Sequence, residues 1–175
     1  MMPVPSHLKG LVVPHEEAID EEALEADVQC PCGEKNFELL YPGEVHEYGG
    51  DTVPCVAQIG EQFFLVLEAR CAACSKEHLL LDADFHGWNG FVCHDPAQAA
   101  TERPPLVPWA CRGCGEHRHT GVVKIQTQGK QDFIDEAGDD FDEERWPDAF
   151  GWFSLDLTCS RCGKRSEDLI SYETM

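Results

Sequence analysis

Eight of the ten cysteines fall into four close pairs, and these pairs restrict the fold of the chain more than any other feature of the sequence. A structural metal site commonly takes four sulfur ligands, supplied as two short pairs that the fold brings together. A chain with four such pairs therefore has to bring distant segments into contact at two places. The pairs are Cys30/Cys32, Cys71/Cys74, Cys111/Cys114 and Cys159/Cys162.

The flanks of the pairs indicate an internal repeat. A shift of 82 residues places the segment 32–34 on 114–116, and a shift of 88 residues places the segment 71–74 on 159–162. The second shift also matches Phe64 with Trp152, Leu67 with Leu155, and Lys76 with Lys164. The difference of six residues indicates an insertion in the second copy, for which its acidic run is the natural place. The repeat predicts that each front pair closes with the following back pair.

The chemistry of the pairs favours metal over disulfides. Ten cysteines in 175 residues of a cytoplasmic chain are best explained by metal ligation, because a reducing compartment does not sustain a disulfide framework. A glycine after the second cysteine suits a tight turn around a metal, and it follows three of the four pairs. We predict two Zn²⁺ ions, and iron is not excluded by the ligands alone. The predicted ligands are Cys30, Cys32, Cys71, Cys74, Cys111, Cys114, Cys159 and Cys162.

Some alternatives to this ligand set stay open. The first pair, Cys-x-Cys, is one residue shorter than the usual Cys-x-x-Cys, so Cys55 or a histidine could replace Cys30. A single site with the other pairs free or redox-active is a second alternative. A thioredoxin-type pair would open a helix, and none of these pairs is followed by a helical pattern. The isolated histidines are interpreted as surface or packing residues: His46, His78, His117 and His119.

The segments 28–82 and 109–172 resemble zinc ribbons with rubredoxin-like knuckles. The start Cys-Pro-Cys-Gly, followed by Phe37-Glu38-Leu39, is similar to the uncharacterised bacterial family named after its Cys-Pro-x-Cys repeats. The resemblance lies in the cysteines and the glycines that follow them. It implies small antiparallel modules built around metal ions.

Hydrophobic alternation predicts a mainly β fold: two tandem zinc-ribbon-like antiparallel modules with a short acidic N-terminal helix. Two segments place alternate residues and the next cysteine of a pair on one face, namely Leu65, Leu67, Ala69 and Cys71, and Phe153, Leu155, Leu157 and Cys159. Further strands are predicted over 37–41, 55–59, 78–83, 121–127 and 168–173. Residues 14–27 combine an initial proline with acids and strong helix formers, and they are predicted to form the helix.

Composition predicts three regions in the chain. Residues 1–27 form an N-terminal extension with the short acidic helix. Residues 28–100 form the first zinc-ribbon-like module, and residues 101–175 form the second, which carries the acidic insertion. The proline-rich composition of the segment 94–109 predicts a linker between the modules, because prolines stiffen a connection.

The charge limits the partners. Thirteen basic and 33 acidic side chains give a net charge of −20, and neither half is basic: residues 1–100 carry 4 basic and 18 acidic groups, and residues 101–175 carry 9 and 15. Such a field repels phosphate backbones and anionic lipid. We therefore expect a basic protein partner, with no direct nucleic-acid contact and no membrane. The N-terminus is too poor in apolar residues for a secretory segment, which predicts a cytoplasmic protein.

The segment 82–95 is the one place where polar, aromatic and ligand-type side chains gather without an obvious structural duty. One hypothesis is a small pocket with Cys93 as a nucleophile and a histidine as its base; the segment contains His86, Trp88, Asn89, Cys93 and His94. The structural interpretation is a turn in which Asn89-Gly90 forms a hairpin, Trp88 caps it and Cys93 is a buried thiol.

The acidic run 132–152 contains nine carboxylates up to Asp148, interleaved with Phe133, Ile134, Phe141, Trp146 and Phe150. It is either an acidic and aromatic surface for a basic partner or an insertion whose aromatic rings cover the second metal site. The spacing of an EF-hand loop is absent, which disfavours calcium.

These observations favour a structural zinc-binding protein that acts as a protein-interaction module through acidic surfaces. The first alternative is an inhibitor or immunity-type protein whose carboxylates imitate the charge of a nucleic acid. The second is an enzyme that uses the segment Asp82–Asp95. No catalytic motif such as HExxH or GxSxG occurs, so no catalytic residue is assigned and an enzyme is the less favoured hypothesis.

Overall fold

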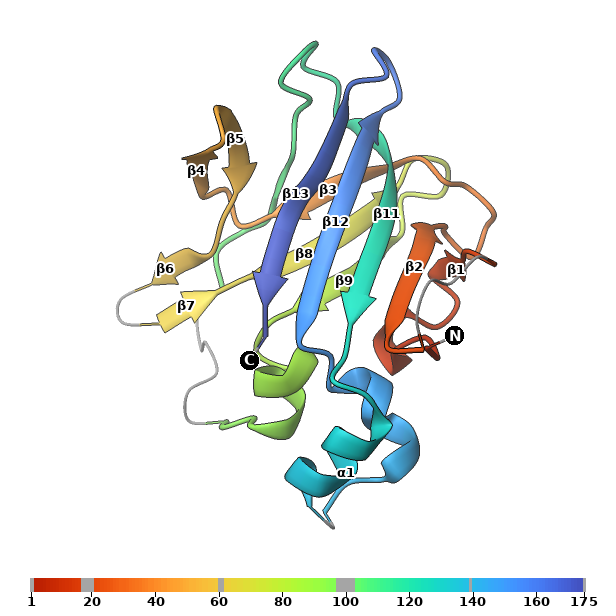
Figure 1. The fold of residues 1–175 in the computed structure, drawn as a ribbon. Helices are drawn as coiled ribbons and strands as arrows, with labels where there is room; N and C mark the ends of the chain where they lie inside the picture. The colour runs from red at the N-terminus through yellow and green to blue at the C-terminus, as the bar shows by residue number, and fades with distance from the viewer. Residues whose placement is uncertain (1, 17–20, 60–61, 97–102, 139, 175) are drawn as a thin grey trace.

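The fold is seen in a computed structural model that describes residues 2–16, 21–59, 62–96, 103–138 and 140–174 (Figure 1). Strands dominate these ranges. In the first half they are β1 Val12–Pro14, β2 Ala23–Val28, β3 Phe37–Tyr41, β4 Val45–Tyr48, β5 Asp51–Pro54, β6 Ala57–Ile59, β7 Gln62–Phe64, β8 Val66–Cys71 and β9 Glu77–Asp82. In the second half they are β10 Val107–Pro108, β11 Arg118–Gln126, β12 Trp152–Cys159 and β13 Arg165–Glu173. The helical segments are η1 Ser6–Leu8, η2 Trp88–Val92, α1 Lys130–Ala137 and η3 Glu143–Asp148.

Nine of the strands form one antiparallel sheet. Its main path is β1-β2-β11-β3-β8-β9, with β12 paired to β11, β13 paired to β12 and β10 paired to β3. The hairpins β4-β5 and β6-β7 pair separately. The prediction of a mainly β, antiparallel fold with little helix is confirmed.

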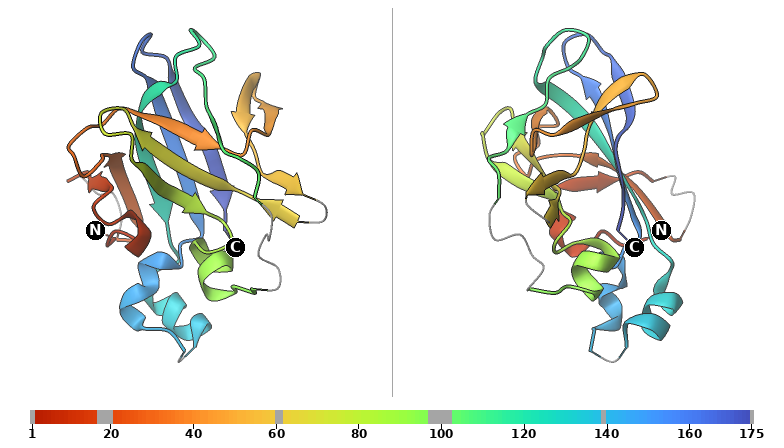
Figure 2. Two further views of the ribbon diagram at one scale, coloured as in Figure 1. Left: turned by 180° about the vertical axis from the view of Figure 1, so that it is seen from behind. Right: turned by 90° about the vertical axis from the view of Figure 1, so that its left-hand side faces the viewer.

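The sheet folds over on itself to enclose the core. Strands β3, β8 and β9 cross behind β11, β12 and β13 at a steep angle (Figures 1 and 2). The two layers are joined where β11 pairs with β3, through only two residue pairs, Arg118 with Glu38 and His119 with Phe37. Gly121 follows this junction, and a Cβ there would lie 2.8 Å from the Phe37 ring, so the glycine allows the ring to lie against β11.

The core between the layers draws on both halves of the chain. Its members share near-complete burial; they include Leu24, Ala26, Phe37, Leu39, Leu67, Ala69, Leu80, Leu81, Val123, Ile125, Phe153, Leu155, Leu157 and Ile170. The two predicted cysteine-bearing faces belong to this core: Leu65, Leu67, Ala69 and Cys71 are buried, as are Phe153, Leu155, Leu157 and Cys159. Cys71 and Cys159 therefore lie on the core-facing sides of β8 and β12, as the alternation predicted.

The predicted N-terminal helix over 14–27 is wrong for the described part of that segment. Residues 23–28 form β2, which pairs with β1 and β11. Leu24, Ala26 and Val28 are buried, and Glu25 between them is exposed. This period of two places one face on the core, and burial outweighs the modest helix propensity of the acids and alanines. Residues 17–20 lie outside the described part.

Strands from both predicted modules share the one sheet. Strand β11, from the second half, lies between β2 and β3, from the first. Each half therefore completes the sheet of the other, and the ranges 28–100 and 101–175 stay a division based on sequence. Residues 97–102, where the boundary was predicted, lie outside the described part.

Among the described residues, no helix has the length and apolar composition needed to cross a membrane.

Candidate metal centres

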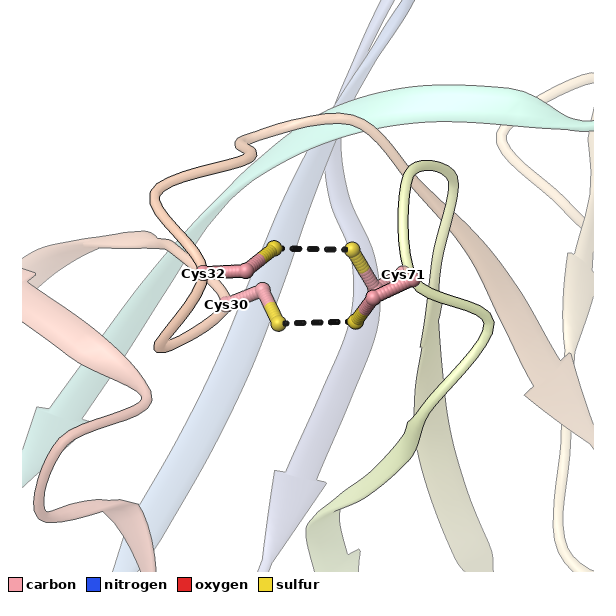
Figure 3. Close-up of side chains that lie close together, drawn as sticks. Cys30, Cys32 and Cys71 are labelled. Carbon is pink, nitrogen blue, oxygen red and sulfur yellow. Dashed lines mark hydrogen bonds between the residues drawn. The ribbon is translucent and has the colours of Figure 1, made fainter.

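The first candidate metal centre joins the loop between β2 and β3 to the turn between β8 and β9. Figure 3 shows Cys30 and Cys32 of the loop facing Cys71, which ends β8. Cys74 of the following turn completes the group. The Sγ atoms of Cys30 and Cys74 are 3.6 Å apart, as are those of Cys32 and Cys71. All four sulfurs lie within 4.8 Å of one another.

The second candidate metal centre repeats this arrangement at the end of β12. Cys111 and Cys114 precede β11, Cys159 ends β12, and Cys162 lies in the turn to β13. The Sγ atoms of Cys111 and Cys162 are 3.6 Å apart, and so are those of Cys114 and Cys159. The pairing within each copy is thus the one that the repeat predicted.

The sulfur spacing fits a tetrahedral metal and not a disulfide. A zinc–sulfur bond of about 2.3 Å places the corners of a regular tetrahedron about 3.8 Å apart. A disulfide would bring two sulfurs to about 2.05 Å. All ten cysteines are free, and Cys55 and Cys93 lie outside both groups. Two groups of four thiols that could each hold one metal ion therefore exist.

The unusual Cys-x-Cys pair is accommodated by a tighter turn. In the second centre the amide of Cys111 donates to the carbonyl of Glu116, five residues on. In the first centre the amide of Cys30 donates to the carbonyl of Glu34, four residues on, at 2.8 Å. The turn is one residue shorter, and the Cys30 sulfur still reaches the group. Neither Cys55 nor a histidine takes the place of Cys30 in it.

The backbone after each pair adopts the left-handed conformation that closes such a turn. Gly33, Gly115 and Gly163 have φ values of 93°, 74° and 72°. The residue after Cys74 is Ser75, and it adopts a φ of 59° without the freedom of a glycine.

Backbone amides in the two back turns favour thiolates. Burial raises the pKa of Cys71, but N–H groups of Cys74 and Ala73 donate to its sulfur, and the balance lowers the pKa to about 7. The same turn around Cys159 likewise lowers its pKa to about 7 against the effect of burial. Burial and hydrogen bonds among the sulfurs raise the pKa of Cys30 to about 12. Cys71 and Cys159 are therefore the sulfurs that these turns prepare to bind a metal as thiolates.

His78 is a residue of the first centre that the sequence interpretation missed. Its Nε2 lies 3.3 Å from the Sγ of Cys30, so the ring is placed to donate a hydrogen bond to that sulfur. The strand register explains this position: His78 on β9 pairs with Ala69, which shares a face with Cys71. The spacing of Cys74 and His78 was the available signal, but only the β8-β9 register gives it meaning.

The remaining isolated histidines do not join a centre. His117 Nδ1 lies 3.2 Å from the carbonyl of Trp109, and His119 is buried with its Nδ1 2.9 Å from the carbonyl of His117. His46 lies on β4, with its ring edge-on to Tyr48.

Asn36 connects the two centres. Its carbonyl accepts a hydrogen bond from the amide of Ala72, inside the back turn of the first centre. Its side-chain Oδ1 accepts one from the hydroxyl of Ser160, inside the back turn of the second. The amide of Ser160 also donates to the carbonyl of Arg118. The two back turns are therefore held by one residue of the β2-β3 connection.

The segment 82–95 does not assemble a nucleophile and its base. His86 Nδ1 accepts from the amide of Asp82, and its ring stacks on His7 with centroids 3.7 Å apart. Cys93 and His94 are exposed, and in the part of the chain that the structure describes no hydrogen bond links Cys93 to a histidine.

The structural interpretation of this segment also needs correction. Asn89-Gly90 lies within η2 and not in a hairpin: η2 is one wide helical turn that closes where the amide of Cys93 donates to the carbonyl of Trp88. Cys93 is exposed and not a buried thiol.

Phe133 and Phe141 of the acidic run pack with η2, whereas Phe150 and Trp146 pack with the main core, so these rings do not cover the second metal centre. Phe133 on α1 is buried, with its ring centroid 6.4 Å from Trp88, 6.5 Å from Phe91 and 6.1 Å from Phe141. Segment α1–η3 lies at one end of the sheet and the turn between β12 and β13 at the other (Figure 1). The two segments that the sequence singled out thus pack on each other.

No protein-family model, curated protein or solved structure matches the chain. The resemblance to zinc ribbons and to the Cys-Pro-x-Cys family accordingly stays a prediction. The sulfur geometry carries the assignment of the metal centres by itself.

Proposed function

We propose that this chain is a structural zinc-binding protein that contacts a basic protein partner through an acidic surface. The observation that carries the metal part is the approach of four sulfurs to within 4.8 Å of one another at two places. Four thiolates in a tetrahedral arrangement are the ligand set of structural zinc sites, which leave no open position for a substrate.

Zinc would act as a structural ion that stabilises the fold. Each centre ties a loop to a β-turn, and the turns contain few apolar side chains of their own. A structural zinc site can supply about 10 kcal/mol to folding. Free thiols at these eight positions are compatible with a reducing compartment, which supports the proposed cytoplasmic location.

The interaction surface proposed here is the acidic end, defined by the exposed carboxylates of α1, η3 and the turn between them: Asp132, Asp135, Glu136, Asp140, Asp142, Glu143 and Glu144. Lys130 and Arg145 are the nearby cations, and each pairs with a carboxylate of this region. Because Phe133 is buried and Phe91 and Phe141 pack around it, the acidic end offers charge in place of aromatic contacts. A surface of this kind favours a basic partner.

Elemental analysis together with native mass spectrometry tests the metal part. We expect two zinc ions per chain, and a chelator strong enough to remove them should abolish the cooperative melt. Iron in place of zinc would correct the identity of the ion. A chain without any transition metal, or a melt that survives complete removal of the metal, would contradict the proposal.

Affinity capture at low and high salt tests the partner. The variant Asp132→Asn, Asp135→Asn, Glu136→Gln should lose a salt-sensitive partner that the native protein retains. The matched control neutralises three exposed carboxylates elsewhere, Glu16→Gln, Glu21→Gln and Glu173→Gln, and should retain it. Equal capture by both variants would show that the acidic end is not the contact.

A further inference from the structure

A groove of about 380 Å³ lies beside the second metal centre. It is bounded by β5, by the start of β13 and by the turn that carries Cys111. A volume of this size is that of a small-molecule site. The lining residues that matter here are Trp109, Arg112, Lys164, Arg165, Ser166 and Asp51.

Arg112 presents an unneutralised guanidinium to this groove. Its Cζ lies 4.8 Å from the centroid of the Trp109 ring, which is itself buried. In the described ranges no carboxylate pairs with Arg112, although the chain carries 33 of them. The ring fixes the plane of the guanidinium and leaves its N–H donors available.

Lys164 supplies a second cation, which forms only a loose ion pair with Asp51. Its Nζ lies 3.6 Å from Asp51 on the exposed β4-β5 hairpin, too far for a hydrogen bond. Arg165 differs, because it pairs with the buried Asp156 at 3.1 Å and, at 3.5 Å, with Glu167, a carboxylate that also lines the groove. Arg165 therefore shapes the wall, while Arg112 and Lys164 remain to bind an anion.

The second metal centre holds both cations in place. Arg112 lies between the ligands Cys111 and Cys114, and Lys164 follows Cys162 by two residues. The carbonyl of Lys164 accepts from the amide of Cys159, and its side chain lies against Gly113 in the opposite turn. A metal that joins the two turns therefore also sets the distance between the two charges.

We propose that this groove binds a compact oxyanion, the phosphate or carboxylate group of a small ligand, between Arg112 and Lys164. Charge-assisted hydrogen bonds from a guanidinium and an ammonium are the usual means of holding such a group. The site stands apart from the proposed acidic contact, which lies at the other end of the sheet. It also gives the second centre a role beyond holding the fold.

Titration of the isotope-labelled, metal-loaded protein followed by NMR tests the proposal, with inorganic phosphate and acetate as probes at constant ionic strength. We expect saturable shifts at the amides of Arg112, Lys164 and Ser166 with at least one probe, and the tighter probe identifies the group. Arg112→Gln with Lys164→Gln should weaken binding at least tenfold. Lys130→Gln, which removes an exposed cation at the acidic end, should leave it unchanged.

The variant Asp51→Asn keeps the test decisive if loss of the cations also disturbs the metal. Asp51 lies on β5, outside the cysteine-bearing turns, and its replacement frees Lys164. The variant should therefore bind the anion about threefold more tightly. Zinc content is measured for every variant by native mass spectrometry. Non-saturable shifts with both probes would overturn the proposal. Equal affinity for the probes in the native protein, the double variant and Asp51→Asn would overturn it as well. The two cations would then serve only to balance the charge of the thiolates.

Discussion

At the scale of single residues, Ser75 departs from the pattern of the four metal-binding turns. The three glycines in the equivalent place adopt positive φ without cost, whereas Ser75 holds a φ of 59° with a Cβ. An L-residue in the left-handed region is destabilised by roughly 1–2 kcal/mol relative to its ordinary conformation. The first centre is therefore the less relaxed of the two.

Replacement of Ser75 by glycine should stabilise the protein. Relief of the left-handed strain exceeds the extra freedom that a glycine gives the unfolded chain, and we expect a net gain of about 0.5–1 kcal/mol. Denaturant unfolding of the zinc-loaded protein measures it. Ala73→Gly in the same turn is the control; Ala73 does not have a positive φ, so this change should destabilise by a similar amount. A loss of stability in both variants would contradict the strain at Ser75.

A second residue-scale feature is the stacked pair of His7 and His86. Burial, then the proximity of His86, lowers the pKa of His7 to about 3, against the raising effects of the Leu80 carbonyl and Asp148. Burial lowers the pKa of His86 as well, although Asp82 and Asp148 oppose this. Both rings are therefore neutral in the folded protein.

Neutral buried histidines make the fold sensitive to acid. Their contribution to stability is fully present above the unfolded pKa of about 6.5 and is lost as pH falls toward the folded value, because the unfolded chain binds the protons first. His7→Phe should make the decline in unfolding free energy between pH 6 and pH 4 shallower by about 1.4 kcal/mol per pH unit. Denaturant unfolding at several pH values measures it. Acid release of metal is common to both proteins, so identical slopes would show that His7 does not titrate on unfolding.

At the scale of elements, the acidic insertion and η2 form one structural unit. Phe133 on α1 is 3 % exposed and contacts rings from both segments. Arg145 adds to it from η3, with its Cζ 4.4 Å from the centroid of the Phe91 ring. Packing within this end of the molecule thus explains Phe133 and Phe141, while Phe150 belongs to the main core.

Truncation of Phe133 to alanine should loosen this end without affecting the metal. Loss of a buried phenyl ring costs about 3 kcal/mol or more. We expect a lower unfolding free energy, faster amide exchange in α1 and η2, and an unchanged zinc content. Ile134→Ala removes a half-buried side chain from the same helix and should cost less. Loss of zinc from the Phe133 variant would restore the interpretation that these rings protect the second centre.

At the scale of the whole molecule, the two metal centres belong to one folding unit. They share the sheet through β11 and β3, and Asn36 contacts the back turn of each. Because Asn36 contacts both back turns, a metal that fixes one turn should favour the position that the other requires, and we expect the two metal ions to bind with positive cooperativity.

Removal of the Ser160 hydroxyl should reduce this cooperativity. The hydrogen bond from Ser160 to Asn36 contributes about 1 kcal/mol, a factor of about five in the balance between singly and doubly loaded chains. Native mass spectrometry at less than two zinc equivalents should therefore show more of the singly loaded species in Ser160→Ala. Ser171→Ala, an exposed hydroxyl on β13, serves as the control. An identical distribution in the native protein and Ser160→Ala would exclude this link as the source of coupling.

The sequence by itself determined the local features of the protein. The spacing of the cysteines and the repeat predicted which cysteines come together in each group of four. Alternation predicted β12 and the buried face of β8, because a period of two with one apolar face has few other solutions. The tertiary structure decided what depends on distant partners. Residues 23–28 form a strand because β11 pairs with them. His78 contacts Cys30 because of the β8-β9 register. Phe133 and Phe141 of the acidic run pack with η2 and not with a metal centre. Arg112 and Lys164 lie 52 residues apart, and only the closure of the second centre brings them to one groove. Propensity and spacing act over a few residues, whereas these contacts join segments whose neighbours no local pattern specifies.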